Sequence, residues 1–158
     1  MNHIETTLVF LRRENEILLA MKKQGHGEGF WNGVGGKLDP GETVEQALIR
    51  ECQEEIGVTP TSYEPIAINA YYQLYRSAPT ENICHVYACT IWEGEPHESE
   101  EMAPQWFQLA DLPLEHMWPD DTLWLRRALS GEKLRCTFRH DDTNQIQTYE
   151  ITNVKDFA

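Results

Sequence analysis

One stretch, residues 35–58, constrains the fold more than any other part of this chain. It reads GGKLDPGETVEQALIRECQEEIGV. Thr43 and Gln46 have the spacing of a capping box at a helix N-terminus, and Gly57 is the residue type that ends a helix in the left-handed conformation. The apolar positions between them are Val44, Ala47, Leu48, Cys52 and Ile56. Their spacing of three to four residues predicts a helix over residues 44–56 with one buried face.

The predicted helix also concentrates negative charge. Glu51, Glu54 and Glu55 are three to four residues apart or adjacent, so they lie on one face. Like charges at this spacing cost a few tenths of a kcal/mol per pair, and the C-terminal half of a helix offers no dipole compensation. Carboxylate oxygens are the ligands that Mg²⁺ and Mn²⁺ prefer. Taken alone, such a cluster is typical of a solvated acidic face, and a metal site is the alternative that the neighbouring residues of this stretch favour.

Short apolar runs on both sides of this helix predict a chain rich in strands. The predicted strands cover residues 6–13, 16–23, 66–75, 83–92, 105–109, 133–140 and 146–154, and a second helix covers residues 122–130. Residues 76–82 read as a loop, and six glycines between residues 25 and 36 suit a loop shaped around a ligand. One early and one late helix among many strands predict an α+β sandwich on a mixed sheet, as a single domain over residues 1–158.

Composition excludes several classes of protein. The formal net charge of −13 argues against polymeric nucleic acid as a partner, but it leaves room for a small anionic ligand that brings metal ions. No apolar run reaches membrane-spanning length, and the N-terminus has no signal-peptide pattern. The four cysteines form no C-x-x-C motif, which favours free thiols. We therefore expect a cytoplasmic protein that binds no membrane.

Residues 36–58 also match a known motif. Gly36, Glu42, Arg50, Glu51, Cys52, Glu54, Glu55, Gly57 and Val58 occupy the specified positions of G-x5-E-x7-R-E-U-x-E-E-x-G-U, where U is a bulky apolar residue. This stretch resembles the Nudix box of the Nudix hydrolases, which cleave a nucleoside diphosphate linked to another group. The resemblance implies the Nudix fold, an α/β/α sandwich with a mixed sheet in which the box forms a loop–helix–loop.

The same resemblance implies roles for the box residues. Glu51 and Glu55 would be the main ligands of Mg²⁺, with Mn²⁺ also possible. Glu54 would be a further ligand or a proton acceptor, and the Gly35 carbonyl an extra ligand. Arg50 would hold a glutamate in place by a charge-assisted hydrogen bond.

Similarity extends beyond the box to the family branch of animal MutT homologues, which hydrolyse oxidised purine nucleoside triphosphates. The segments that carry it are MKKQGHGEGFWNG, ESEEMAPQWFQL and HMWPDD. It implies a monomer that converts 8-oxo-dGTP and 2-hydroxy-dATP to the monophosphate and pyrophosphate, which removes damaged nucleotides from the pool. The implied substrate-binding residues are Thr7, Lys22, Asn32, Tyr71, Trp118, Asp120 and Asp121, and Glu101 would add a carboxylate near the metal.

Asp120 and Asp121 are the most informative of these residues. Two carboxylates forced together seldom both ionise, so the pair can offer one hydrogen-bond donor and one acceptor to a purine. Alternatives stay open for several positions: one aspartate as a helix cap, Trp118 as core, and Asn32 as a turn residue. His26 stands where the animal enzymes carry an aromatic hydrocarbon, and it is either part of the pocket or a solvated loop residue.

The function also has alternatives. The chain could be a Nudix diphosphatase for another purine substrate, such as a methylated purine triphosphate or a dinucleotide. It could also be a non-catalytic Nudix module that binds a nucleotide, although such a module would not need Arg50, Glu51, Glu54 and Glu55 all intact.

Overall fold

The computed structural model describes residues 1–158. The α-helices are α1 (Val44–Ile56) and α2 (Asp121–Leu129). The strands are β1 (Asn2–Arg13), β2 (Glu16–Lys22), β3 (Trp31–Asn32), β4 (Val34–Lys37), β5 (Thr59–Tyr75), β6 (Ala78–Glu93), β7 (Met102–Gln108), β8 (Lys133–His140) and β9 (Ile146–Val154). Two short 3₁₀ helices, Leu109–Asp111 and Leu114–His116, lie between β7 and α2. No helix is long and apolar enough to cross a membrane.

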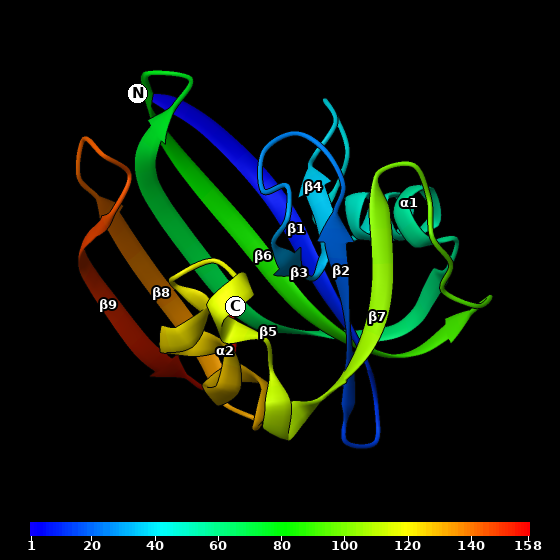
Figure 1. Cartoon of the computed structure of the whole chain (residues 1–158). Helices are drawn as coiled ribbons and strands as arrows, with labels where there is room; N and C mark the ends of the chain where they lie inside the picture. The colour runs from blue at the N-terminus through cyan, green and yellow to red at the C-terminus, as the bar shows by residue number, and fades with distance from the viewer.

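The strands form one mixed sheet in the order β3-β2-β1-β6-β5-β8-β9, with β4 paired to β1 and β7 paired to β2. The pairs β1–β6 and β5–β8 are parallel, and the other pairs are antiparallel. β1 and β2 form the predicted hairpin, although only two residue pairs link them near the turn. Most of β1 instead pairs with β4 and β6, which places β1 at the centre of the fold (Figure 1).

The sheet has a separate hydrophobic core on each face. Side chains alternate along a strand, so Phe10 on β1 points to one face while Val9 and Leu11 point to the other. Phe10 belongs to the cluster that packs under α2, and Val9 and Leu11 belong to the cluster that packs under α1. The helices therefore cover opposite faces, as Figure 1 shows, and the predicted α/β/α sandwich is confirmed.

Helix α1 begins and ends as predicted. The Thr43 side chain accepts a hydrogen bond from the Gln46 N–H, and the Gln46 side chain accepts one from the Thr43 N–H. Gly57 has φ 74°, and its N–H completes the C-terminal turn. The buried residues are Ala47, Leu48, Cys52, Glu55 and Ile56. Glu55 is the one charged residue among them, and it sits on the face that packs against the sheet.

Two predictions about local structure were wrong. Residues 76–82 are not a loop, because β5 runs to Tyr75 and β6 begins at Ala78. Arg76 and Ser77 alone make the turn, with φ of 53° and 63°. Two successive residues with positive φ characterise the hairpin turn whose twist matches that of the strands it joins.

The second wrong prediction is the aspartate cap of α2. Asp120 occupies the N-cap position with helical backbone angles, and its side chain makes no capping hydrogen bond. Its carboxylate instead bonds to residues in the sheet and in the helix itself.

Candidate active site

The glutamates of α1 lie against β4, which approaches closely because it carries Gly35 and Gly36. A Cβ atom on Gly36 would lie 2.7 Å from Glu51 Oε1, and one on Gly35 would lie 1.8 Å from the Thr7 carbonyl oxygen. Only glycine leaves room for these contacts. Gly36 thus leaves the space that the Glu51 carboxylate occupies, and Gly35 allows the close approach of β4 to β1.

Arg50 organises the acidic face through five hydrogen bonds. Its Nε and Nη2 donate to Glu42 at 2.7 and 2.9 Å, and its Nη1 donates to Glu51 at 3.0 Å and Glu54 at 3.3 Å. Nη2 also donates to the Lys37 carbonyl oxygen. The hydrogen bonds from Arg50 lower the pKa of Glu42 to about 2, so Glu42 stays ionised and clamps the loop before α1 to the helix.

Glu55 is the buried glutamate whose negative charge has no cationic partner. It is 7% exposed, and its Oε2 atom is buried with no hydrogen-bond partner. Burial, followed by the negative charge of Glu51, raises the pKa of Glu55 to about 9. An unpaired buried carboxylate oxygen beside a second carboxylate is costly without a cation. The oxygens of Glu51 and Glu55 therefore fit a hard divalent metal ion.

The other predicted metal ligands are less closely assembled. Glu54 points to Arg50 and its side chain is 60% exposed, and Glu101 is exposed on the segment before β7. The negative charge of Glu101 nevertheless reaches Glu55 and contributes to its raised pKa. The structure brings no three acidic, histidine or cysteine side chains together as a group that could hold an ion. Glu51 and Glu55 form the centre of the site, with Glu54 and Glu101 at its margin.

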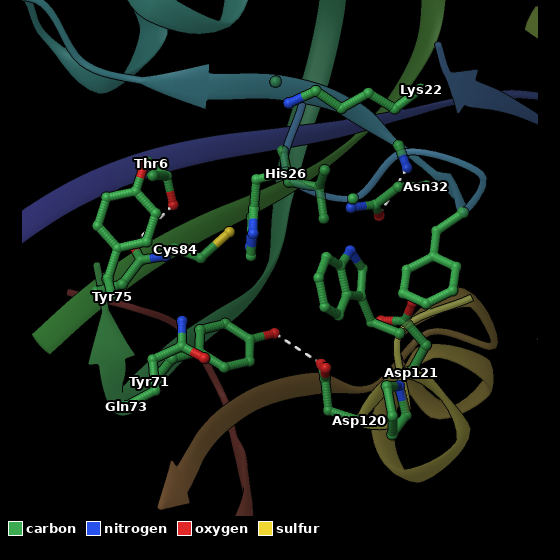
Figure 2. A pocket seen from close by; sticks show the side chains of 18 of the residues that line it. Thr6, Lys22, His26, Asn32, Tyr71, Gln73, Tyr75, Cys84, Asp120 and Asp121 are labelled. Atoms are coloured by element: carbon green, nitrogen blue, oxygen red, sulfur yellow. Dashed lines mark hydrogen bonds between the residues drawn. The ribbon is translucent and has the colours of Figure 1, made fainter. Parts of the chain in front are cut away.

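A cavity of about 840 Å³ reaches Gly35 and Gly36 of β4, and none of the four glutamates lines it. All seven predicted substrate-binding residues line it, namely Thr7, Lys22, Asn32, Tyr71, Trp118, Asp120 and Asp121. Gly35 and Gly36 line it too, so it extends to the strand against which Glu51 and Glu55 pack. Its size falls within the range of small-molecule sites. Figure 2 shows the aspartates on one side of it and Lys22, His26 and Asn32 on another.

Trp118 is a wall of this cavity and not part of either core. Its ring lies 4.9 Å from Phe30 and 5.1 Å from His26, measured between ring centroids. His26 also meets the edge of Tyr75 at 5.9 Å. Burial, followed by the charge of Lys22, lowers the pKa of His26 and keeps its ring neutral. Of the two interpretations of His26, the structure supports the pocket residue.

Two polar residues of the cavity have clear environments. Asn32 lies at the end of β3 and lines the cavity, and its side-chain oxygen accepts a hydrogen bond from the Gly33 N–H at 2.8 Å. Thr7 is 2% exposed, and its Oγ1 has no hydrogen-bond partner. A buried hydroxyl without a partner at a cavity wall is available to a ligand.

Asp120 and Asp121 have unequal surroundings. Asp120 Oδ2 accepts hydrogen bonds from Tyr71 Oη at 2.7 Å and from Trp124 Nε1 at 2.9 Å. Asp121 Oδ2 is buried without a partner. Burial, followed by the charge of Asp120, raises the pKa of Asp121 well above its ordinary value. Burial also raises the pKa of Asp120, but the two donors oppose that effect.

Several residues of the site were missed from the sequence, among them Trp124, Asn69 and Phe30. Trp124 bonds Asp120 from one helical turn away, Asn69 donates to Tyr71 Oη at 3.2 Å, and Phe30 packs on Trp118. The alternation along β5 could have revealed Asn69, because residues two apart on a strand face the same side and Tyr71 was already a candidate. Trp124 reads as an ordinary apolar helix residue, and nothing in the sequence distinguishes it.

Comparison with known proteins agrees with this geometry. The model of the NUDIX domain matches residues 1–128. The chain is 37% identical over 150 residues to the oxidized purine nucleoside triphosphate hydrolase of Danio rerio, covering 95% of each chain. It is 30% identical over 115 residues to the 8-oxo-dGTP diphosphatase of Escherichia coli, covering 71% of this chain and 85% of the other. The crystal structure of a MutT protein from Bacillus halodurans superposes with a TM-score of 0.77 at 22% identity, covering 94% of this chain and 97% of that one.

Proposed function

The chain belongs to the NUDIX family, and on that premise we propose that it hydrolyses oxidised purine (deoxy)nucleoside triphosphates to the monophosphate and pyrophosphate with Mg²⁺. The main support for the proposal is that a single cavity has two chemically different ends. One end reaches the strand beneath Glu51 and Glu55, and the other is walled by Trp118 and the unequal pair Asp120 and Asp121. The names of the relatives agree with this substrate class.

The glutamate end serves the triphosphate. Glu51 and Glu55 would hold Mg²⁺ (or Mn²⁺), with Glu54, Glu101 and the Gly35 carbonyl as further ligands. When bound, the metal neutralises phosphate charge and lowers the pKa of an attacking water. Arg50 fixes the position of Glu51 through its hydrogen bond. Glu54 is more exposed than Glu55, which makes it available to accept a proton from water.

The other end selects the base. Trp118 gives a flat surface for stacking, worth about 1–3 kcal/mol per base. Asp120, Asp121 and Asn32 supply acceptors and donors for the edge of a purine. Thr7 adds a buried hydroxyl without a partner, and Lys22 lines the same cavity with a positive charge.

The chain as a whole fits a small independent enzyme. We infer a single domain over residues 1–158, because β8 and β9 join the same sheet as β1 through β5. We also propose a monomer in the cytoplasm. The four cysteines are buried and unpaired, which suits a reducing compartment.

A substrate panel tests the proposal. Initial rates with Mg²⁺ would be compared for 8-oxo-dGTP, 2-hydroxy-dATP, dGTP and ADP-ribose, with pyrophosphate and phosphate measured separately. We expect kcat/KM to be highest for the oxidised purines and the product to be pyrophosphate. A large preference for ADP-ribose would contradict the base-pocket assignment, and no turnover of any compound would favour a nucleotide-binding module.

A further inference from the structure

The hydroxyl group of Tyr71 donates a hydrogen bond to Asp120, a member of the acidic pair. The Tyr71 ring is held in place by stacking on Phe138, with ring centroids 5.3 Å apart and an interplanar angle of 20°. Its oxygen accepts the hydrogen bond from Asn69 Nδ2, so the single hydroxyl hydrogen is free to be donated to Asp120. Figure 2 shows this bond crossing from β5 to the start of α2.

Trp124 reinforces the same asymmetry. An indole N–H can only donate, so its 2.9 Å bond to Asp120 Oδ2 requires an acceptor there. Two donors on one oxygen favour the ionised form of Asp120. Asp121 Oδ2 receives no such bond and is buried, so its protonated form costs less. The proton that the pair shares is thereby placed on Asp121.

The surrounding titratable groups do not oppose this arrangement. Cys84 on β6 and Cys136 on β8 have pKa values raised by burial to about 12, so both thiols are neutral. His140 on β8 also faces the site, and its positive form would favour the charge on Asp120. Lys22 and His26 line the same cavity from the segment on its other side.

We propose that Tyr71, through its hydrogen bond to Asp120, is a positioning residue that fixes Asp120 as the acceptor and Asp121 as the donor, and so restricts the pocket to one of two base classes, guanine-type or 2-hydroxyadenine-type. The inference rests on the proposed function. The two base classes carry their carbonyl and amino groups at exchanged positions of the ring. A pair whose proton moves freely can bind both, whereas a fixed pair matches one.

The fixed arrangement serves one of the two base classes. Binding the other class in the same place would require the proton to move to Asp120, against the hydrogen bonds from Tyr71 and Trp124. Specificity then depends on a residue that need not touch the nucleotide.

The test compares wild type with Tyr71→Phe, which keeps the ring and removes only the hydroxyl. Tyr72→Phe is the matched control, because Tyr72 is the next residue on β5 and its hydroxyl donates to Glu81 outside the cavity at 2.7 Å. The first readout is the ratio of kcat/KM for 8-oxo-dGTP to that for 2-hydroxy-dATP. We expect Tyr71→Phe to bring this ratio at least about tenfold closer to one, mainly through changes in KM. Tyr72→Phe should leave the ratio unchanged.

The second readout needs no substrate. Carbon-13 NMR of the side-chain carboxyl groups, assigned with Asp120→Asn and Asp121→Asn, reports which aspartate holds the proton. We expect an ionised Asp120 and a protonated Asp121 at neutral pH in wild type, and ionisation of Asp120 at higher pH in Tyr71→Phe. Thermal unfolding of each variant confirms that the fold is retained.

The outcomes separate the two proposals. A wild type that hydrolyses neither oxidised nucleotide contradicts the proposed function, while the NMR titration still decides where the proton lies. An unchanged ratio in folded Tyr71→Phe, a wild-type ratio close to one, or a proton found on Asp120 would each overturn the inference about Tyr71.

Discussion

Glu54 and Glu55 are adjacent in the sequence, yet their environments give them different chemistry. The Glu54 side chain is 60% exposed and pairs with Arg50, so water and a cation both compensate its charge. Glu55 is 7% exposed and has a buried oxygen without a partner. The one-residue offset turns Glu55 toward the sheet, where the loss of water makes its charge costly and its affinity for a cation high.

The pH dependence of stability should follow from Glu55 in the metal-free protein. Its pKa rises from 4.5 to about 9 on folding, so the folded state holds a proton that the unfolded state releases. The contribution of Glu55 to the free energy of unfolding is therefore greatest below its unfolded pKa and is lost as pH rises toward about 9. Urea unfolding with a chelator should show that Glu55→Gln reduces this fall by at least about 1 kcal/mol. Glu54→Gln is the control, and an equal pH slope in both variants would contradict the assignment.

Activity should depend on the same residue. Glu55→Gln keeps the size of the side chain but weakens it as a ligand for Mg²⁺. We expect kcat to fall at least about 100-fold at saturating Mg²⁺, with unchanged far-ultraviolet circular dichroism. Glu45→Gln, in the first turn of the same helix, should retain activity. A near-normal rate in Glu55→Gln would remove Glu55 from the proposed metal site.

Helix α1 is positioned by its contact with β4 as much as by its own sequence. Thr43 and Gly57 set where it begins and ends, and Arg50 ties it to the preceding loop through Glu42. The approach to β4 depends on Gly36, since any larger residue would enter the space of Glu51. The loop, helix and strand thus act as one unit that sets the positions of the carboxylates.

Gly36→Ala tests this unit. The added Cβ would lie 2.7 Å from Glu51 Oε1, so the carboxylate must move by several tenths of an ångström or more. We expect kcat/KM to fall about tenfold to 100-fold, because small displacements at a reacting centre are costly. The melting temperature should fall by only a few degrees, because each kcal/mol of lost unfolding free energy lowers it by about 2–4 °C. Wild-type kcat/KM in a folded Gly36→Ala protein would show that the spacing is not required.

Metal binding should stabilise the same unit. At Mg²⁺ concentrations about 100 times Kd, binding to the folded state alone contributes about 2.7 kcal/mol. We expect the melting temperature of wild type to rise by roughly 5–10 °C with Mg²⁺ relative to a chelator, and that of Glu55→Gln to change little. Scanning calorimetry measures both. Equal shifts in the two proteins would indicate binding elsewhere.

The whole molecule is built as two cores that share one sheet. Phe10, Ile17 and Leu19 face the core under α2, while the alternate residues of β1 and β2 face the core under α1. Each central strand contributes side chains to both cores. Loss of packing in either core should therefore also destabilise the other core, because the two cores share strands. The site lies at their boundary.

Matched substitutions test this coupling. Leu48 under α1 and Leu125 under α2 are both 0% exposed. We expect Leu48→Ala and Leu125→Ala each to reduce the free energy of unfolding by about 2–5 kcal/mol. Each protein should unfold in a single transition that coincides by tryptophan fluorescence and circular dichroism in urea. Two separated transitions in either variant would mean that the cores are independent.

Prediction from the sequence succeeded where the determinants are local. The capping box, the Gly57 end and the apolar spacing of α1 involve residues within one or two turns of each other, and their geometry is confirmed. It failed for residues 76–82, where strand pairing over the full length of β5 and β6 reduces an expected loop to two residues. It also failed for the cap of α2, because Tyr71, 49 residues away in sequence, competes for the Asp120 carboxylate.

The sequence by itself determined the family, the order of most elements and the identity of the acidic residues, because these depend on residue type and short-range spacing. Only the tertiary structure decided which carboxylates differ from the rest. Residues 35–58 contain five glutamates, and packing against β4 buries Glu55 while Glu54 remains in water. Asp120 and Asp121 likewise cannot be distinguished from the sequence. In the structure, hydrogen-bond donors on β5 and α2 reach Asp120 and not Asp121. Burial and long-range hydrogen bonds determine the free-energy cost of a charge, and neither can be predicted from the local sequence.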